Sequence, residues 1–90
     1  MKLGRIVATA TLVAYCQENE IDLMPYIHCY ELNDWGVSSS EEQHQNNMDM
    51  FNLSGRIIAT YELPTGKRFW IVTEWNEQER ITTAMFPDDY

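Results

Sequence analysis

The chain has few basic side chains. Six Lys and Arg residues stand against 14 Asp and Glu residues, which gives a formal net charge of −8. A protein that binds nucleic acid or an anionic membrane surface needs Lys and Arg opposite the phosphates, so the shortage argues against both functions. Two uses of the surplus acid stay open: solubility, and attraction to a partner protein with a basic surface.

Long apolar runs are also lacking. No stretch approaches the roughly 18 apolar residues from which a membrane-spanning helix is built. The N-terminal stretch begins with Lys2 and is mildly apolar, but Arg5, Thr9 and Thr11 interrupt it, which is atypical of a secretory signal peptide. We therefore expect a cytoplasmic protein whose two cysteines are reduced thiols.

Patterns that carry catalytic or cofactor chemistry are missing as well. The four glycines each stand alone, so no Gly-rich loop predicts a phosphate site. The zinc-binding atoms belong to Cys16, His28, Cys29 and His44, whose spacing matches no paired zinc motif. No acid is placed by the sequence to orient a Cys–His nucleophile pair. We expect no metal, no cofactor and no enzymatic activity.

The residues that are present suit one small domain. Ninety residues are enough for a single core, and three Trp, five Tyr and three Phe supply large apolar area. We expect residues 1–90 to form one domain.

The first half of the sequence predicts two to three helices. Thr9 or Thr11 can cap a helix that runs to about Glu18, since a hydroxyl accepts from the free N–H groups of the first turn. Its expected buried stripe is Leu12, Val13 and Cys16. Asp22 is the expected cap of a second helix, and Pro25 falls in its first turn, where the missing N–H costs little. The buried stripe there is expected at Leu23, Tyr26, Ile27 and Tyr30, with helical spacing.

A third, polar helix is expected after the serines at 38–40. Ser39 with Glu42, or Ser40 with Gln43, has the spacing of a capping box. Gly55 is a suitable left-handed stop. The expected apolar side consists of Met48, Phe51 and, as an option left open, His44.

The second half changes to the composition of strands. Arg56–Leu63 and Arg68–Trp75 are rich in β-branched and aromatic residues and are joined by a short turn. Ile81–Phe86 follows as a third strand after a polar turn at 76–79. Residues 4–8 form either a short strand or an extended arm. The predicted fold class is α+β, with two to three N-terminal helices packed on a C-terminal three-stranded antiparallel meander.

Several segments follow one another in a recognisable order. They are Arg5–Thr9, Asp34–Gly36, Ile58–Gly66, Trp70–Glu74, Arg80–Thr83 and Pro87–Tyr90. In this order the chain resembles a family of small "plasmid-related" proteins of bacterial mobile elements. The likeness covers most of the chain and is loosest over residues 10–33. The resemblance implies a mobile-element setting, in which small acidic proteins that block nucleic-acid-binding enzymes are a recurring solution.

Charge and resemblance together predict a binding function. We expect a small acidic protein that docks on a basic protein partner and inhibits a host defence or nucleic-acid-binding protein. The alternative is a self-associating structural or housekeeping subunit without catalytic activity, in which a sheet edge or the Trp faces are buried in a homodimer.

The candidate binding residues lie in a loop, in the last two strands and at the C-terminus. They are Asp34, Trp35, Glu74, Arg80, Thr82, Asp88, Asp89 and Tyr90. Trp35 is either an anchor that folds its loop onto the core or an exposed contact. Arg80 either forms a surface ion pair, with Glu74 or a glutamate of the turn, on a Thr-rich solvent face, or belongs to a polar recognition patch on the exposed sheet face. The acidic end is either solvated or bound to a partner. The strand at 68–75 is apolar on both sides, which indicates burial of both faces or an interface.

Overall fold

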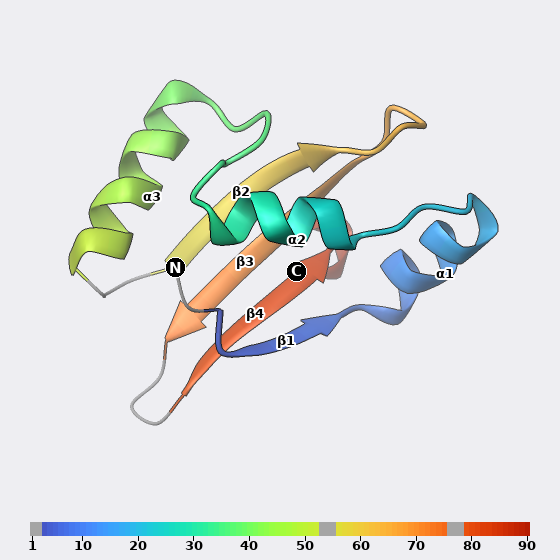
Figure 1. The fold of residues 1–90 in the computed structure, drawn as a ribbon, viewed down its shortest axis with the longest axis horizontal. Coiled ribbons are helices and arrows are strands. Elements are labelled where there is room, and N and C mark those ends of the chain that lie inside the picture. Colours follow the sequence, from blue (N-terminus) through green and yellow to red (C-terminus); the bar gives the residue numbers. More distant parts are fainter. Residues whose placement is uncertain (1–2, 53–55, 76–78) are drawn as a thin grey trace.

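The computed structural model describes residues 3–52, 56–75 and 79–90. Its elements are β1 (Arg5–Ala8), α1 (Ala10–Glu18), α2 (Met24–Glu31), α3 (Ser40–Asn52), β2 (Arg56–Glu62), β3 (Arg68–Trp75), β4 (Arg80–Met85) and a 3₁₀ turn, η1 (Pro87–Asp89). In Figure 1, α2 crosses one face of the sheet, α1 lies beyond the end of β1, and α3 runs beside β2. The fold class is α+β, as predicted. The expected helix stop Gly55 and most of the expected turn at 76–79 lie outside the described residues.

The sheet has four strands, where the sequence analysis predicted three. Strands β2, β3 and β4 form the expected antiparallel meander, but β1 pairs with β4 in parallel, so the strand order is β1-β4-β3-β2. The purely antiparallel, three-stranded prediction is therefore wrong. Residues Arg5–Ala8 take the strand option that was left open, and their partner is the last strand of the chain. Local composition does not report such a long-range pairing.

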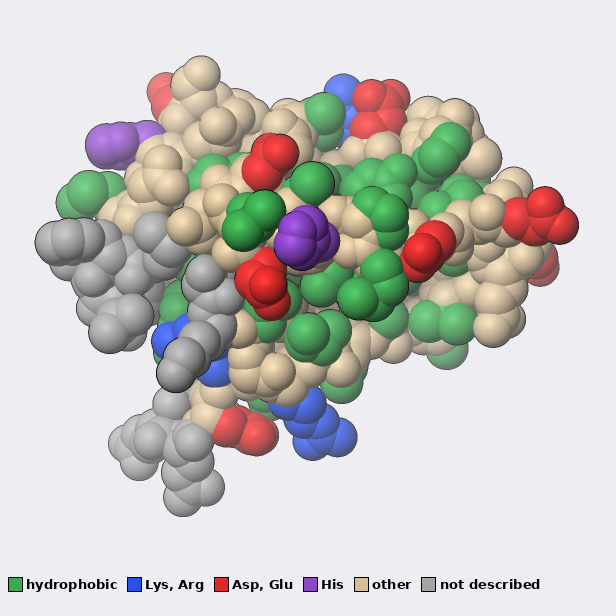
Figure 2. Space-filling view, in the orientation of Figure 1, with side chains coloured by type: hydrophobic (Ala, Val, Ile, Leu, Met, Phe, Trp, Pro, Cys, Tyr) green, Lys and Arg blue, Asp and Glu red, His purple; other side chains and the backbone are tan. Residues whose placement is uncertain are grey.

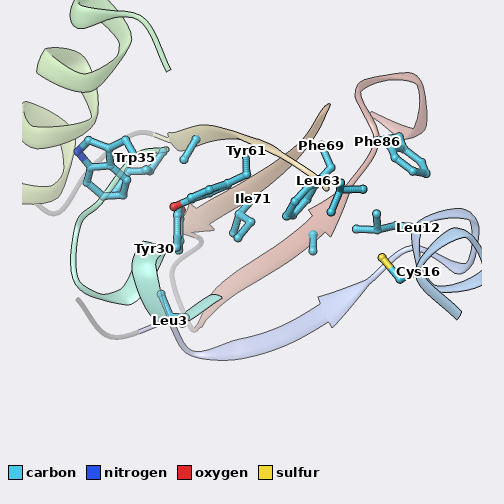
Figure 3. Packing of buried hydrophobic residues seen from close by; sticks show 13 residues of the cluster. Leu3, Leu12, Cys16, Tyr30, Trp35, Tyr61, Leu63, Phe69, Ile71 and Phe86 are labelled. Carbon is cyan, nitrogen blue, oxygen red and sulfur yellow. The ribbon is translucent and has the colours of Figure 1, made fainter. Parts of the chain in front are cut away.

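One face of the sheet holds the hydrophobic core. The strands contribute Ile57, Ala59, Tyr61, Phe69, Ile71 and Ala84, and Figure 3 shows Leu12 and Cys16 of α1 and Tyr30 of α2 pointing toward them. Tyr26 of α2 packs edge-on against Phe69, with ring centroids 5.3 Å apart. Val13, which was expected in the stripe of α1, is exposed. That part of the prediction is wrong because α1 meets the core through the side that carries Leu12, Tyr15 and Cys16.

The helix starts follow local capping chemistry with one correction. Thr9 caps α1 through its hydroxyl, as predicted, and the Ser39 hydroxyl accepts from the first turn of α3. In α2 the N-cap position belongs to Leu23, so the prediction of Asp22 as the cap is wrong. The Asp22 carboxylate instead accepts from the backbone N–H of Met24 at 2.9 Å.

Helix α3 meets the sheet through amide groups. Asn46 is buried, and its side chain both donates to the carbonyl of Ile58 at 2.8 Å and accepts from the N–H of Ile58 at 3.2 Å. The Thr60 N–H donates to the Ser38 hydroxyl at 2.9 Å, and the Thr60 carbonyl accepts from the N–H of Val37 at 2.8 Å. The outer edge of β2 is thereby hydrogen-bonded at two successive outward positions, which protects an edge that would otherwise recruit strands.

This arrangement corrects the expected apolar side of α3. Met48 and His44 are both exposed, and the side chain of Phe51 lies outside the described part of the structure. Among the described side chains of α3, an asparagine with the geometry of a peptide group makes the contact, because the surface that it meets is a strand edge with polar backbone groups.

Candidate interaction surfaces

The outer side of α2 exposes large apolar side chains among acids. Met24, His28 and Leu32 are four residues apart and so share one side of the helix. Met24 and Leu32 are 62% and 66% exposed. Asp22 precedes this stripe and Glu31 lies beside it, and both are exposed. We call these five residues the α2 face. The signal for it, apolar residues at helical spacing on a second side of the same helix, is present in the sequence but was missed.

Negative charge is segregated along the chain. Residues 6–55 contain eight of the 14 Asp and Glu residues and none of the six Lys and Arg residues. The six acids elsewhere balance the six bases, so the whole net charge of −8 arises in the segment that carries the helices. Figure 2 shows the helical side, where hydrophobic and acidic side chains gather over α2 while Lys and Arg lie toward the margins. The field on this side attracts cations.

The predicted loop residues Asp34 and Trp35 make their contacts with other residues of the same chain. Trp35 is buried, its ring packs edge-on against Tyr30 at 5.4 Å, and its Nε1 donates to Asn47 at 2.9 Å. It is therefore the anchor of its loop and has no exposed contact surface. Asp34 is exposed, but its carboxylate accepts from the N–H of Gly36 and its carbonyl accepts from the Tyr61 hydroxyl.

The predicted strand residues do not form one patch. Thr82 is buried, donates to the carbonyl of Leu3 at 2.7 Å and so has no exposed surface for a partner. Glu74 is exposed. The register places Arg80 opposite Trp75, with its guanidinium 4.9 Å from the indole centroid. Because neighbouring positions of a strand point to opposite faces, Glu74 and Arg80 do not face each other as one of the predicted pairings required.

Of the predicted C-terminal residues, Asp89 and Tyr90 contact other parts of the protein, whereas Asp88 is exposed without a described contact of this kind. The Asp89 carboxylate accepts from the Thr9 hydroxyl at 2.9 Å and from the N–H of Phe86 at 3.2 Å, which ties the chain end to the start of α1. Asp88 is exposed. Tyr90 folds back so that its ring lies 6.1 Å from that of Trp70. This C-terminal turn therefore borders the sheet face opposite the core.

That opposite face, which we call the open sheet face, carries two apolar cross-strand rows. The register aligns Val7, Thr83, Val72 and Ile58 in one row, and Met85, Trp70 and Thr60 in the next. A charged row with Arg5, Ile81, Glu74 and Arg56 lies at one end. Of the elements described, α3 borders this face beside β2 and the C-terminal turn borders it at Trp70. The two-sided apolar pattern of β3 is thus explained by a core on one side and this face on the other.

A groove of about 310 Å³ runs between α3 and the open sheet face. Its lining combines one aromatic ring with charged and amide groups: Glu42, Gln45, Asn46, Arg56, Ile58, Thr60 and Trp70. The Arg56 guanidinium lies 4.9 Å from the centroid of the Tyr90 ring, so a cation–π contact with the C-terminal residue holds this side chain at the groove.

The groups with shifted pKa values are buried and structural. Burial raises the pKa of the Cys16 thiol, which keeps it protonated and lowers its reactivity. Burial also raises the pKa of Tyr30 and Tyr61 above that of a free phenol. Among the described residues no three His, Cys, Asp or Glu side chains are grouped closely enough to hold a metal ion. None of the described helices has the length and apolar character needed to cross a membrane.

The chain matches no family model, no curated protein and no solved structure. The α2 face, the open sheet face and the distribution of charge are the features of the described structure that bear on function.

Proposed function

We propose that the protein is a small acidic binding module that docks on a basic surface of a partner protein through the α2 face. The observation that carries the proposal is the confinement of the net charge of −8 to residues 6–55, the helical segment that includes this face. Acidic surfaces of this kind speed encounter with cationic partners and orient them before contact.

The apolar residues of the α2 face provide anchors that a partner can bury, which charge alone does not provide. Met24 and Leu32 are exposed over more than half their surface, at the two ends of one helical side. Apolar anchors surrounded by charge are the usual composition of a protein contact, with desolvated groups at the centre and polar groups at the rim. A purely solubilising surface requires acids but not two exposed anchors.

The resemblance to proteins of mobile elements supports the choice of partner. A host defence protein that handles nucleic acid has a basic surface, and an acidic module that occupies this surface blocks access of phosphates to it. The protein then acts as an inhibitor in the cytoplasm, by binding and without turnover.

The experiment is affinity capture followed by binding to the purified captured protein. Leu32→Lys combined with Glu31→Lys removes one anchor and reverses one charge on the α2 face, while Met48→Lys replaces one exposed apolar side chain of α3 with lysine. We expect the double variant to weaken binding at least about tenfold, Met48→Lys to have a much smaller effect, and wild-type binding to weaken as salt is raised. Equal binding by the folded double variant, or binding that is independent of salt, would refute the proposal.

A further inference from the structure

The open sheet face is more apolar than a solvated sheet face. An antiparallel sheet with one solvated face normally alternates between apolar residues inside and polar residues outside. Here the outward positions include Val7, Ile58, Trp70, Val72, Ile81 and Met85. Charged residues stand at the ends of the strands, and apolar residues occupy the middle of the face.

The apolar rows are covered unevenly. Val72 and Met85, near the centre, are only 1% and 7% exposed, and neither belongs to the core cluster on the helical side. Their neighbours Thr83 and Trp70 are half-buried, and Val7 at the edge is 37% exposed. The accessible part of this apolar strip is therefore formed by Val7, Thr83, Ile58 and Trp70, which lie around the buried Val72.

Charge decides which occupant suits this strip. The outward charged residues of the strands are Arg5, Arg56, Arg68, Glu62 and Glu74, which nearly balance. The net charge of −8 lies in the helical segment, whose α1 and α2 pack on the opposite side of the sheet. Glu42 of α3 lines the groove beside this face and completes the balance with the three arginines. A second copy that approaches with the same face therefore meets a nearly neutral surface, and the acids of α1 and α2 of both copies lie on the far side of each sheet. A strongly basic partner would find no complementary field here.

The outer edge of β2 favours a contact between faces over an extension of the sheet at that edge. The outer edge of β2 is already hydrogen-bonded by Asn46 and Ser38. Trp70, in the second row, packs against Tyr90 at the border of the face, and the two rings add aromatic area of the kind that stabilises protein contacts.

We propose that two copies of the chain pack open sheet face against open sheet face about a twofold axis. The result is a four-layer arrangement, helices–sheet–sheet–helices, with the two sheets about 10 Å apart. The row from Val7 to Ile58 lies at the centre of the contact. The apolar strip is small compared with obligate interfaces, so the dimer dissociates on dilution. The proposal is independent of the partner proposed for the α2 face, which stays exposed in the dimer.

Sedimentation equilibrium over a series of protein concentrations tests the dimer. Wild-type protein is expected to move from a mass of 10.6 kDa at low concentration to twice that value at high concentration. Thr83→Lys places a charge in the middle of the apolar row at a half-buried, already polar site, and Val7→Glu does so on the exposed edge strand. Each is expected to raise the dissociation constant at least about tenfold, because an unpaired charge would be buried in the contact.

Circular dichroism and thermal unfolding establish that the two variants are folded. Leu32→Lys, on the α2 face, is the matched control and is expected to leave self-association unchanged. Capture of the basic partner, in turn, is expected to survive Thr83→Lys, so the two proposals fail separately. A wild-type protein that is monomeric at every concentration, or a dimer that both folded variants leave intact, would overturn the proposal.

Discussion

The hydroxyl of Tyr30 on α2 lies 2.6 Å from the hydroxyl of Thr73 on β3, inside the core. Thr73 in turn lies 2.9 Å from the hydroxyl of Thr82 on β4, and Thr82 donates to the carbonyl of Leu3. A hydroxyl has one proton to donate, so the direction of the hydrogen bond from Thr82 to Leu3 fixes the direction of the other two. Thr82 donates to Leu3, Thr73 donates to Thr82, and Tyr30 donates to Thr73.

This chain of hydroxyls joins a helix, two strands and the segment before β1. It crosses the sheet under the helical layer, where each member is satisfied by the next and no water is needed. It also explains why three polar side chains, which the sequence places in otherwise apolar elements, are fully buried. Thr82 was predicted to bind a partner, and its partners are within the chain.

Alkaline pH is expected to destabilise the protein through Tyr30 and Tyr61. Burial raises the pKa of both phenols above the ordinary value of 10.0. Below pH 10 both the folded and the unfolded chain keep these protons. Above it the unfolded chain releases them while the folded chain does not, so the free energy of unfolding falls by about 1.4 kcal/mol per pH unit for each tyrosine. Urea unfolding between pH 8 and pH 11 measures the slope.

Tyr30→Phe separates the contribution of one phenol. At neutral pH the variant is expected to lose about 1–2 kcal/mol, because Thr73 no longer receives its hydrogen bond. At alkaline pH its stability should decline less steeply than that of the wild type, and Tyr61→Phe should reduce the slope in the same way. A wild-type stability that stays level up to pH 11, or a decline that neither variant reduces, would contradict this account.

Replacement of Asn46 is expected to open the outer edge of β2. Asn46→Leu keeps a similar volume but leaves the N–H and the carbonyl of Ile58 without their side-chain partners. We expect a loss of about 2–3 kcal/mol in the free energy of unfolding and faster aggregation, since unpaired edge groups recruit other strands. Urea unfolding and light scattering measure the two effects. Glu41→Leu adds the same side chain at an exposed site of α3 and should change little; equal behaviour of the two variants would refute this role of Asn46.

Two glycines with positive φ angles provide a matched test of backbone packing. A Cβ at Gly36 would lie 2.4 Å from the carbonyl oxygen of Thr60 and 2.6 Å from the ring of Tyr61, whereas a Cβ at Gly66 would meet nothing within 4 Å. Gly66→Ala is expected to cost about 1 kcal/mol through backbone strain alone. Gly36→Ala is expected to cost at least about 2 kcal/mol more, because the loop must leave β2. Equal thermal shifts for the two variants would show that the close contact at Gly36 has no effect on stability.

Much of the local structure could be predicted because it depends on neighbouring residues. Thr9 and Ser39 lie where hydroxyl caps start α1 and α3, and Pro25 lies in the first turn of α2. The hairpin of β2 and β3 follows from strand-forming residues on either side of a short turn. These features arise from hydrogen bonds and steric preferences within a few residues, so the sequence contains their cause in readable form.

The candidate surfaces were harder to predict for a different reason. The predicted binding residues do not form one surface in the folded chain. Trp35 and Thr82 are buried, Asp89 accepts a hydrogen bond from Thr9, and Glu74 and Arg80 point to opposite faces of the sheet. Residue type alone does not tell whether a polar or aromatic side chain finds its partner within the chain or outside it. The absence of Lys and Arg from residues 6–55 is visible in the sequence itself, and this segment includes α2.

The sequence by itself determined the α+β class, the starts of α1 and α3, the antiparallel hairpin and the surplus of negative charge, because composition, capping and periodicity act over short distances. Only the tertiary structure decided that β1 joins β4, that Asn46 protects the edge of β2, and that the apolar rows of β3 and β4 face away from α1 and α2. Those outcomes depend on contacts between residues far apart in the chain, and such contacts are selected by the packing of the whole molecule.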